Sequence, residues 1–140
     1  MGANADNHRR SVDLFNARDW DAFAADLAAD CEFADEARGI TVKGPQQAVE
    51  FEQGWVSAFS DATITMPRVV DGDSTTVLLF SGRGTNDGPL GPLPATARSV
   101  SLPFCEVRDY GTDGKVVRSA LYYDQVTMLT QLGHMPAPEG

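Results

Sequence analysis

The hydrophobic pattern changes its period once along the chain, and this change limits the possible folds more than any other feature. In the first 60 residues apolar side chains recur at helical spacing, as Trp20, Phe23 and Leu27 do at i, i+3 and i+7. From residue 62 the pattern alternates with a period of two, which is typical of strands with one buried face. Helices followed by long strands predict an α+β fold, with the helices packed on an antiparallel sheet.

The first half is predicted to hold three helices and two short strands. Helices are expected around residues 12–15, over 20–27 and from Gly44-Pro45 onward, where proline suits the first helical turn. The apolar stripe of the third helix is formed by Ala48, Phe51, Trp55 and Phe59. Short strands are expected at residues 31–35 and 39–42.

The second half is predicted to form four long strands, at residues 62–70, 74–85, 98–110 and 115–124. Turns at "DGD" (71–73) and "GTDG" (111–114) would join two pairs of them as hairpins. Residues 86–97 hold three prolines and two glycines, so they are expected to form a loop over one end of the sheet that could act as a lid.

Charge and length limit the partners and the number of domains. With 11 Lys and Arg against 20 Asp and Glu, the net charge of −9 argues against nucleic acid and anionic membranes as partners. No apolar run approaches the roughly 20 residues of a membrane span, and "MGANADNHRR" lacks the apolar core of a signal peptide, so we expect a cytoplasmic protein. The 140 residues suit one domain, 1–140, with a core over about 8–133.

Histidine chemistry is not expected. The only histidines, His8 and His134, lie close to the two ends, where chains are usually poorly ordered. A Ser-His-Asp or Cys-His device or a histidine metal site would have to be built from terminal residues. Proton chemistry is therefore expected from carboxylates, Tyr, Lys or Arg, without a metal or another cofactor.

Two stretches resemble a known family. "FNARDWDAFAADLAADCEFAD" near the start and "LYYDQVTMLTQLG" at the end are similar to the SnoaL-like polyketide cyclase branch of the nuclear-transport-factor-2-like superfamily, over about residues 8–133. The resemblance implies a cone-shaped barrel, in which a strongly curved, mostly antiparallel sheet packs on three N-terminal helices and a short C-terminal helix follows. It also implies a deep pocket and a homodimer formed through the outer sheet face. Members include polyketide cyclases, ketosteroid isomerase, limonene epoxide hydrolase and non-catalytic binding or dimerisation domains, so the residues must decide the function.

Asp124 is the first candidate acid/base. Alternation places Tyr122 and Asp124 on one face of the last strand and Leu121 and Tyr123 on the other, without fixing which face is concave. In the family that this chain resembles, the acid at the position of Asp124 points into the pocket, where burial would raise the pKa of a carboxyl toward neutral pH. The alternative is an aspartate that caps the following helix.

Asp35 and Glu106 are further candidates. Asp35 aligns with the proton-shuttling carboxylate of the ketosteroid isomerases, or else it is a polar residue at a strand end. Glu106 lies among apolar neighbours, which predicts that it faces the pocket and pairs with Arg83 or Arg118, whereas the alternative is a surface glutamate.

Two departures weaken the alternative activities. Ser11 stands where the isomerase has its oxyanion-hole tyrosine, so a dienolate would lose its main stabilisation. Arg83 and Thr85 stand where the epoxide hydrolase pairs an arginine with an aspartate.

The remaining expectation is a cofactor-independent cyclase acting on an apolar, polyketide-like small molecule by intramolecular aldol reaction or cycloaddition. Alternatives are an isomerase or epoxide-type hydrolase of the same fold and a non-catalytic binding or dimerisation domain. Aromatic residues are expected to line or back the pocket, with Arg83 at its mouth: Trp20, Phe51, Trp55, Phe59, Phe80, Phe104 and Tyr122.

Overall fold

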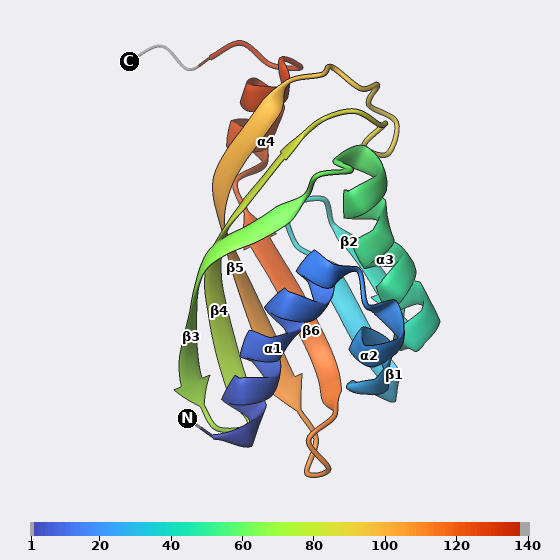
Figure 1. Ribbon diagram of the computed structural model, residues 1–140, viewed down its shortest axis with the longest axis vertical. Helices are drawn as coiled ribbons and strands as arrows, with labels where there is room; N and C mark the ends of the chain where they lie inside the picture. The colour runs from blue at the N-terminus through green and yellow to red at the C-terminus, as the bar shows by residue number, and fades with distance from the viewer. Residues whose placement is uncertain (1, 138–140) are drawn as a thin grey trace.

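A computed structural model describes residues 2–137 of the chain, which form four helices and one six-stranded sheet (Figure 1). The helices are α1 (Ala3–Ala17), α2 (Trp20–Ala25), α3 (Gly44–Ala58) and α4 (Gln125–Leu132). The strands are β1 (Leu27–Asp35), β2 (Ile40–Lys43), β3 (Thr63–Gly72), β4 (Thr75–Thr85), β5 (Ser99–Tyr110) and β6 (Val116–Tyr123).

The sheet has the strand order β2-β1-β6-β5-β4-β3. The β1 strand runs parallel to β6, whereas every other neighbouring pair is antiparallel. The long strands curve, and α1 and α3 lie on the concave side (Figure 1). A register shift between Thr65 and Arg68 interrupts the pairing of β3 with β4, as a β-bulge does where an edge strand bends. This α+β architecture confirms the predicted fold.

Local sequence explains the helix boundaries. The helix α1 ends at Arg18, whose left-handed backbone (φ 59°) reverses the chain, and the Asp19 carboxylate then accepts a hydrogen bond from the Ala22 N–H and caps α2. The predicted helix over 20–27 is too long, because α2 ends at Ala25 and Leu27 instead pairs with Val116 of β6. Strand pairing here overrides the helical spacing of the apolar residues.

The N-terminal segment is well packed, contrary to the expectation of poor order. The helix α1 begins at Ala3 and packs on β3 and β4, so the side chain of His8 is fully buried. Its contacts with β4 and β5 belong to the candidate site described below.

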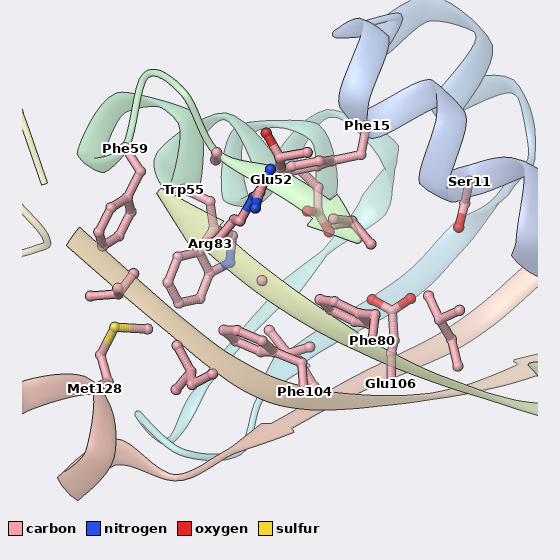
Figure 2. A pocket seen from close by; sticks show the side chains of 18 of the residues that line it. Ser11, Phe15, Glu52, Trp55, Phe59, Phe80, Arg83, Phe104, Glu106 and Met128 are labelled. Carbon is pink, nitrogen blue, oxygen red and sulfur yellow. The ribbon is translucent and has the colours of Figure 1, made fainter. Parts of the chain in front are cut away.

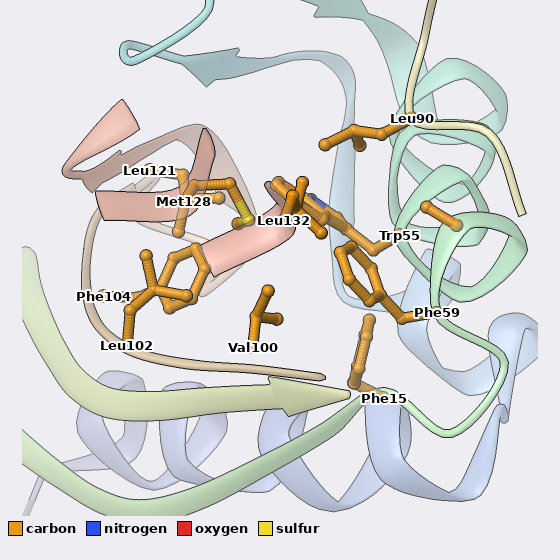
Figure 3. Packing of buried hydrophobic residues seen from close by; sticks show 11 residues of the cluster. Phe15, Trp55, Phe59, Leu90, Val100, Leu102, Phe104, Leu121, Met128 and Leu132 are labelled. Atoms are coloured by element: carbon orange, nitrogen blue, oxygen red, sulfur yellow. The ribbon is translucent and has the colours of Figure 1, made fainter. Parts of the chain in front are cut away.

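Residues 86–98 do not form a loose lid. Asn86 is 1% exposed, and its side-chain amide donates hydrogen bonds to the carbonyl oxygens of Ala58 and Gly88, while its side-chain oxygen accepts one from the Thr96 N–H. Leu90 packs in the same hydrophobic cluster as Trp55 and Phe59 (Figure 3). Hydrogen bonds of Asn86 therefore hold the base of the loop, and Leu90 packs the loop against the hydrophobic core.

Candidate active site

A cavity of about 80 Å³ lies between the concave face of the sheet and the helices α1 and α3 (Figure 2). Its aromatic lining consists of Phe15, Phe23, Trp55, Phe59, Phe80 and Phe104. Its polar lining consists of Ser11, Glu52, Thr63, Arg83, Glu106 and Arg108. This volume is smaller than the roughly 300–1,000 Å³ of typical ligand pockets, so a large guest would require the walls to move.

The cavity opens beside Arg83. An outer groove shares Thr63, Arg83 and Val100 with the cavity, so these residues connect the interior with solvent. The aromatic wall lies further in, where the Phe80 and Phe104 rings stack in parallel with their centroids 5.1 Å apart. A guest entering beside Arg83 therefore meets a flat apolar surface.

A buried group of charged and polar side chains lies at the inner end of the cavity. Glu106 Oε1 lies 2.9 Å from His8 Nε2 and 3.2 Å from Arg108 Nε. The Arg108 guanidinium is 5.5 Å from the ring centroids of both Phe23 and Phe33, and the residue is only 2% exposed. Glu106 faces the pocket as predicted, but its partners are Arg108 and His8 rather than Arg83 or Arg118.

These contacts keep Glu106 ionised. Burial would raise the pKa of its carboxyl, but the positive charge of Arg108 and the hydrogen bond from His8 outweigh burial and lower the pKa to about 2. Burial lowers the pKa of His8, which therefore stays neutral. Burial also disfavours the charged form of Arg108, but the Glu106 carboxylate reverses this effect and raises the pKa of the guanidinium.

Glu52 is the second carboxyl in the cavity, and it lacks such partners. It extends from α3, is 8% exposed, and forms no hydrogen bond or ion pair with any residue in 2–137. Burial, followed by repulsion from Glu106, raises the pKa of Glu52 to about 8, against a smaller opposing effect of Arg108. One cavity thus holds a carboxylate, Glu106, and a carboxyl that is mostly protonated at neutral pH, Glu52 (Figure 2).

Asp35 is fully buried but does not line the cavity. Its Oδ2 atom accepts hydrogen bonds from Arg38 Nε at 2.7 Å and from the Tyr123 hydroxyl at 2.9 Å. Burial and the negative charge of Asp35 raise the pKa of Tyr123, so this hydroxyl stays protonated and donates. The Tyr123 ring packs 5.6 Å from Trp55, so Asp35 supports the aromatic wall from behind. Of the two alternatives for Asp35, the structure agrees with a polar residue at a strand end.

The expectation that Asp124 points into the pocket is wrong. Asp124 is exposed and caps α4, accepting hydrogen bonds from the Val126 N–H at 3.0 Å and the Thr127 hydroxyl at 2.7 Å. The Thr127 hydrogen bond lowers the pKa of the Asp124 carboxyl. The physical reason is strand register: Tyr123 pairs with the inward-facing Phe104, which turns Tyr122 and the following aspartate away from the cavity.

The other predicted binding residues divide into three groups. Trp55, Phe59, Phe104 and Arg83 line the cavity. Trp20 and Phe51 lie behind its wall, packed against the hydrophobic core, and do not line it. Tyr122 is 46% exposed on the outer face of the sheet, so its predicted contact with a ligand is wrong.

Sequence reasoning missed three residues that set the charges of this site, Glu52, Arg108 and His8. The sequence contains a signal for Glu52. Positions 48, 52, 55 and 59 have helical spacing, just as positions 48, 51, 55 and 59 do, so Glu52 can lie on the buried face of the helix. An acid on an apolar stripe deserves notice, since burying an unpaired carboxyl is costly. For His8, the apolar spacing of Ala5, Val12 and Phe15 indicates a helix that begins well before residue 12.

The described residues, 2–137, contain no group of three or more His, Cys, Asp or Glu side chains placed to hold a metal ion. None of the helices within this range has the length and apolar character needed to cross a membrane.

The curved six-stranded sheet, with helices on its concave side and a cavity between them, defines the cone-shaped α+β fold of the nuclear-transport-factor-2-like and ketosteroid-isomerase-like proteins. A sequence model of the SnoaL-like polyketide cyclase family matches residues 5–132. The chain belongs to this family. Membership suggests a role of the cyclase or isomerase type.

Solved structures of low sequence identity share the fold. A candidate SnoaL-like polyketide cyclase from Jannaschia sp. CCS1 is 20% identical with a TM-score of 0.85, and the match covers 95% of this chain and 93% of that one. A candidate polyketide cyclase from Pseudomonas putida KT2440 is 20% identical with a TM-score of 0.80, covering 94% and 99%. AclR from Streptomyces galilaeus, described as a candidate hydroxylase, is 21% identical with a TM-score of 0.75, covering 91% and 79%. No curated protein matches the sequence.

Proposed function

We propose that this protein is a cyclase-type enzyme that moves a proton on an enolisable carbonyl compound, with Glu52 as both base and acid. The observation that supports the proposal is the Glu52 carboxyl, which is buried, lines the cavity and has no hydrogen-bond partner among residues 2–137. A pKa of about 8 leaves a useful fraction of both protonation states near neutral pH.

The proposed reaction is an intramolecular aldol ring closure. Ionised Glu52 removes a proton from the carbon next to one carbonyl group, and the electron pair of that C–H bond forms the new C–C bond to a second carbonyl carbon. The π electrons of the second carbonyl move to its oxygen, which takes the proton back from Glu52. The proton has then moved from carbon to oxygen, and Glu52 has returned to its starting state.

The neighbouring charges suit this role. The Glu106 carboxylate repels a negative charge on Glu52 and so makes the Glu52 carboxylate a stronger base. The stacked rings of Phe80 and Phe104 give the substrate an apolar surface against which its two carbonyl groups can be held close together. Arg83, exposed at the opening, would contact a polar end of the substrate.

Isomerisation is the second candidate, and the cavity volume favours it. A space of about 80 Å³ suits a small ring better than a long folded chain. Moving a proton from one carbon to another needs the same Glu52 cycle but no ring closure.

Two small probes test the proposal. Cyclisation of 2,6-heptanedione to 3-hydroxy-3-methylcyclohexanone is followed by proton NMR, and conversion of cyclohex-3-enone to cyclohex-2-enone by ultraviolet absorbance. We expect the wild type to accelerate at least one reaction and Glu52→Gln to lose most of that rate, about 100-fold or more. The matched control is Glu50→Gln, an exposed residue of the same helix, which should keep the wild-type rate. If the wild type is no faster than Glu52→Gln on either probe, the proposed acid/base role is wrong.

We also propose a homodimer formed through the outer sheet face. Two apolar side chains on this face, Tyr122 and Val70, are 46% and 50% exposed. Sedimentation equilibrium should give twice the chain mass of 15.0 kDa, and introducing a charge with Tyr122→Glu should shift the protein to monomer. A monomeric wild type at micromolar concentration would contradict the proposal.

A further inference from the structure

His8 connects α1 to two strands at the inner end of the cavity. Its Nδ1 atom lies 2.7 Å from Thr76 Oγ1 on β4, and its Nε2 atom lies 2.9 Å from Glu106 Oε1 on β5. The side chain is fully buried and does not itself line the cavity. It can therefore act on a bound molecule only through the residues that it contacts.

The two contacts of His8 fix the position of its ring proton. An ionised carboxylate only accepts hydrogen bonds, so the hydrogen between His8 and Glu106 must belong to Nε2. A neutral imidazole has one N–H group, which leaves Nδ1 as an acceptor for the Thr76 hydroxyl. Thr76, which is itself fully buried, thus orients the histidine, and the histidine directs its N–H group at Glu106.

Two cavity carboxyls compete for one buried positive charge. Arg108 is held between the Phe23 and Phe33 rings, and its Nε atom reaches Glu106 and Ser119, at 3.2 and 3.3 Å, but not Glu52. The charged and titratable groups around the two carboxyls come from three elements: His8 on α1, Arg108 and Tyr110 on β5, and the two glutamates themselves on α3 and β5. Arg108 Nε and His8 Nε2 thus both contact Glu106 and not Glu52, and the His8 hydrogen bond adds to the effect of the Arg108 ion pair.

We propose that His8 is a positioning residue that, together with Arg108, assigns the negative charge to Glu106 and thereby keeps Glu52 free to exchange a proton with a molecule in the cavity. Without the His8 hydrogen bond, Glu106 holds its charge less strongly and takes up a proton at a higher pH. The functional meaning of this assignment rests on the proposed role of Glu52, but the assignment itself is measurable without any substrate.

The test compares two substitutions at one position. In His8→Gln, the side-chain amide N–H lies near the place of Nε2 and can still donate a hydrogen bond to Glu106. In His8→Asn, the side chain is too short to reach Glu106 and keeps only the hydrogen bond with Thr76. Carbon-13 NMR of protein labelled at the glutamate carboxyl carbons follows the titration of each glutamate. The resonance that titrates lowest in the wild type is assigned to Glu106 by its loss in Glu106→Gln, and the one that titrates highest is assigned to Glu52 by its loss in Glu52→Gln.

We expect His8→Asn to raise the midpoint of the Glu106 titration by about one pH unit or more, and His8→Gln to restore it close to the wild-type value. An unchanged Glu106 midpoint in a folded His8→Asn variant would overturn the inference. A raised midpoint in both variants would also overturn it, because the Glu106-directed donor would then not be the cause.

A measurement on the wild type avoids any failure of the variants to fold. Nitrogen-15 NMR of the His8 ring should show a protonated Nε2, a bare Nδ1 and a neutral ring at neutral pH, because burial lowers the pKa of the imidazole. A protonated Nδ1 would overturn the inference directly. If these titrations appear as expected but Glu52→Gln turns over the probes like the wild type, the proposed enzymatic function fails while the charge assignment stands.

Discussion

The Tyr123 hydroxyl donates a hydrogen bond to Asp35 Oδ2 over 2.9 Å, which joins the end of β6 to the end of β1 behind the cavity wall. Arg38 completes the group, with Nε 2.7 Å from the same oxygen and its guanidinium 4.8 Å from the Trp55 ring centroid. The position of Trp55, which lines the cavity, therefore depends on a buried carboxylate that does not reach the cavity.

Asp35→Asn should destabilise the protein, because it leaves Arg38 and Tyr123 facing a neutral amide inside the protein. Breaking a buried, hydrogen-bonded pair costs about 2–4 kcal/mol of unfolding free energy, measurable by urea denaturation. Asp30→Asn, an exposed change on the same strand, is the matched control and should have little effect. Equal effects of the two substitutions would contradict the bracing role of Asp35.

Glu52 should make the protein less stable as the pH rises. Its pKa is about 8 in the folded state and 4.5 for a free glutamate side chain, so between these values the folded state binds a proton that the unfolded state has lost. The unfolding free energy therefore falls as the pH rises through this window, by up to about 1.4 kcal/mol per pH unit. Glu52→Gln should remove this fall and have a higher Tm than the wild type at about pH 8.

Glu106 has the opposite dependence. Its folded-state pKa of about 2 lies below the 4.5 of a free glutamate side chain, so its contribution to stability is present above pH 4.5 and is lost as the pH falls toward 2. Scanning Tm from about pH 3 to pH 9 should thus give a maximum on the acidic side of neutrality. A wild-type Tm that rises steadily up to pH 8 would be inconsistent with a buried Glu52 carboxyl.

Gly82→Ala should disturb the aromatic wall. A Cβ atom at Gly82 would lie 2.6 Å from Cε1 of Phe104, whose ring is stacked on Phe80 and has little room to withdraw. Overpacking of this kind costs about 1–3 kcal/mol, and turnover of the probe compounds should fall as well. Gly54→Ala is the contrasting change, because a Cβ there meets nothing within 4 Å on α3, and it should stabilise the protein by about 0.5–1 kcal/mol.

Arg83→Gln should affect binding more than chemistry. Arg83 lies at the opening and away from the buried carboxyls, so we expect a higher KM for a 1,5-diketone probe with a carboxylate end, such as 4,8-dioxononanoate, and a nearly unchanged kcat. The matched control is Arg68→Gln, an exposed residue of β3 that does not line the cavity. A loss confined to kcat would contradict a binding role.

Asp124→Ala should lower Tm by a few degrees without reducing turnover of the probes. The substitution removes the side-chain cap of α4, since the hydrogen bonds to Val126 and Thr127 are lost. Circular dichroism melts and the NMR rate assay measure the two effects separately. A large loss of turnover in a folded variant would return the acid/base role to Asp124.

The fold was predictable because periodicity reports burial along a whole element. The four long strands and the third helix each contain enough alternation or helical spacing to indicate their type, and the structure agrees within a few residues. The second helix was predicted too long because Leu27 fits both the helical spacing and the strand β1 that pairs with β6. Nothing local distinguishes these two states.

The orientation of β6 was not predictable in the same way. Tyr122 and Tyr123 are identical residues on opposite faces, and their neighbours Ser119 and Ala120 are both small and both buried. Alternation separates the two faces, but the concave side is decided by pairing with β5, where Tyr123 lies opposite Phe104. For this reason the predicted site contained Tyr122 and Asp124, whereas the residue of β6 that lines the cavity is Leu121.

The hydrogen bond from Asn86 to the last residue of α3, Ala58, should influence how a guest molecule enters the cavity. Because the segment carrying Leu90 is held across its base by backbone hydrogen bonds between Asn86, Ala97 and Arg98, we expect it to stay in place when a guest enters. We expect molecules to exchange instead beside Thr63 and Arg83, on the paired strands β3 and β4. Uptake should then slow with the cross-section of the guest, and solvent viscosity should affect it only through ordinary diffusion.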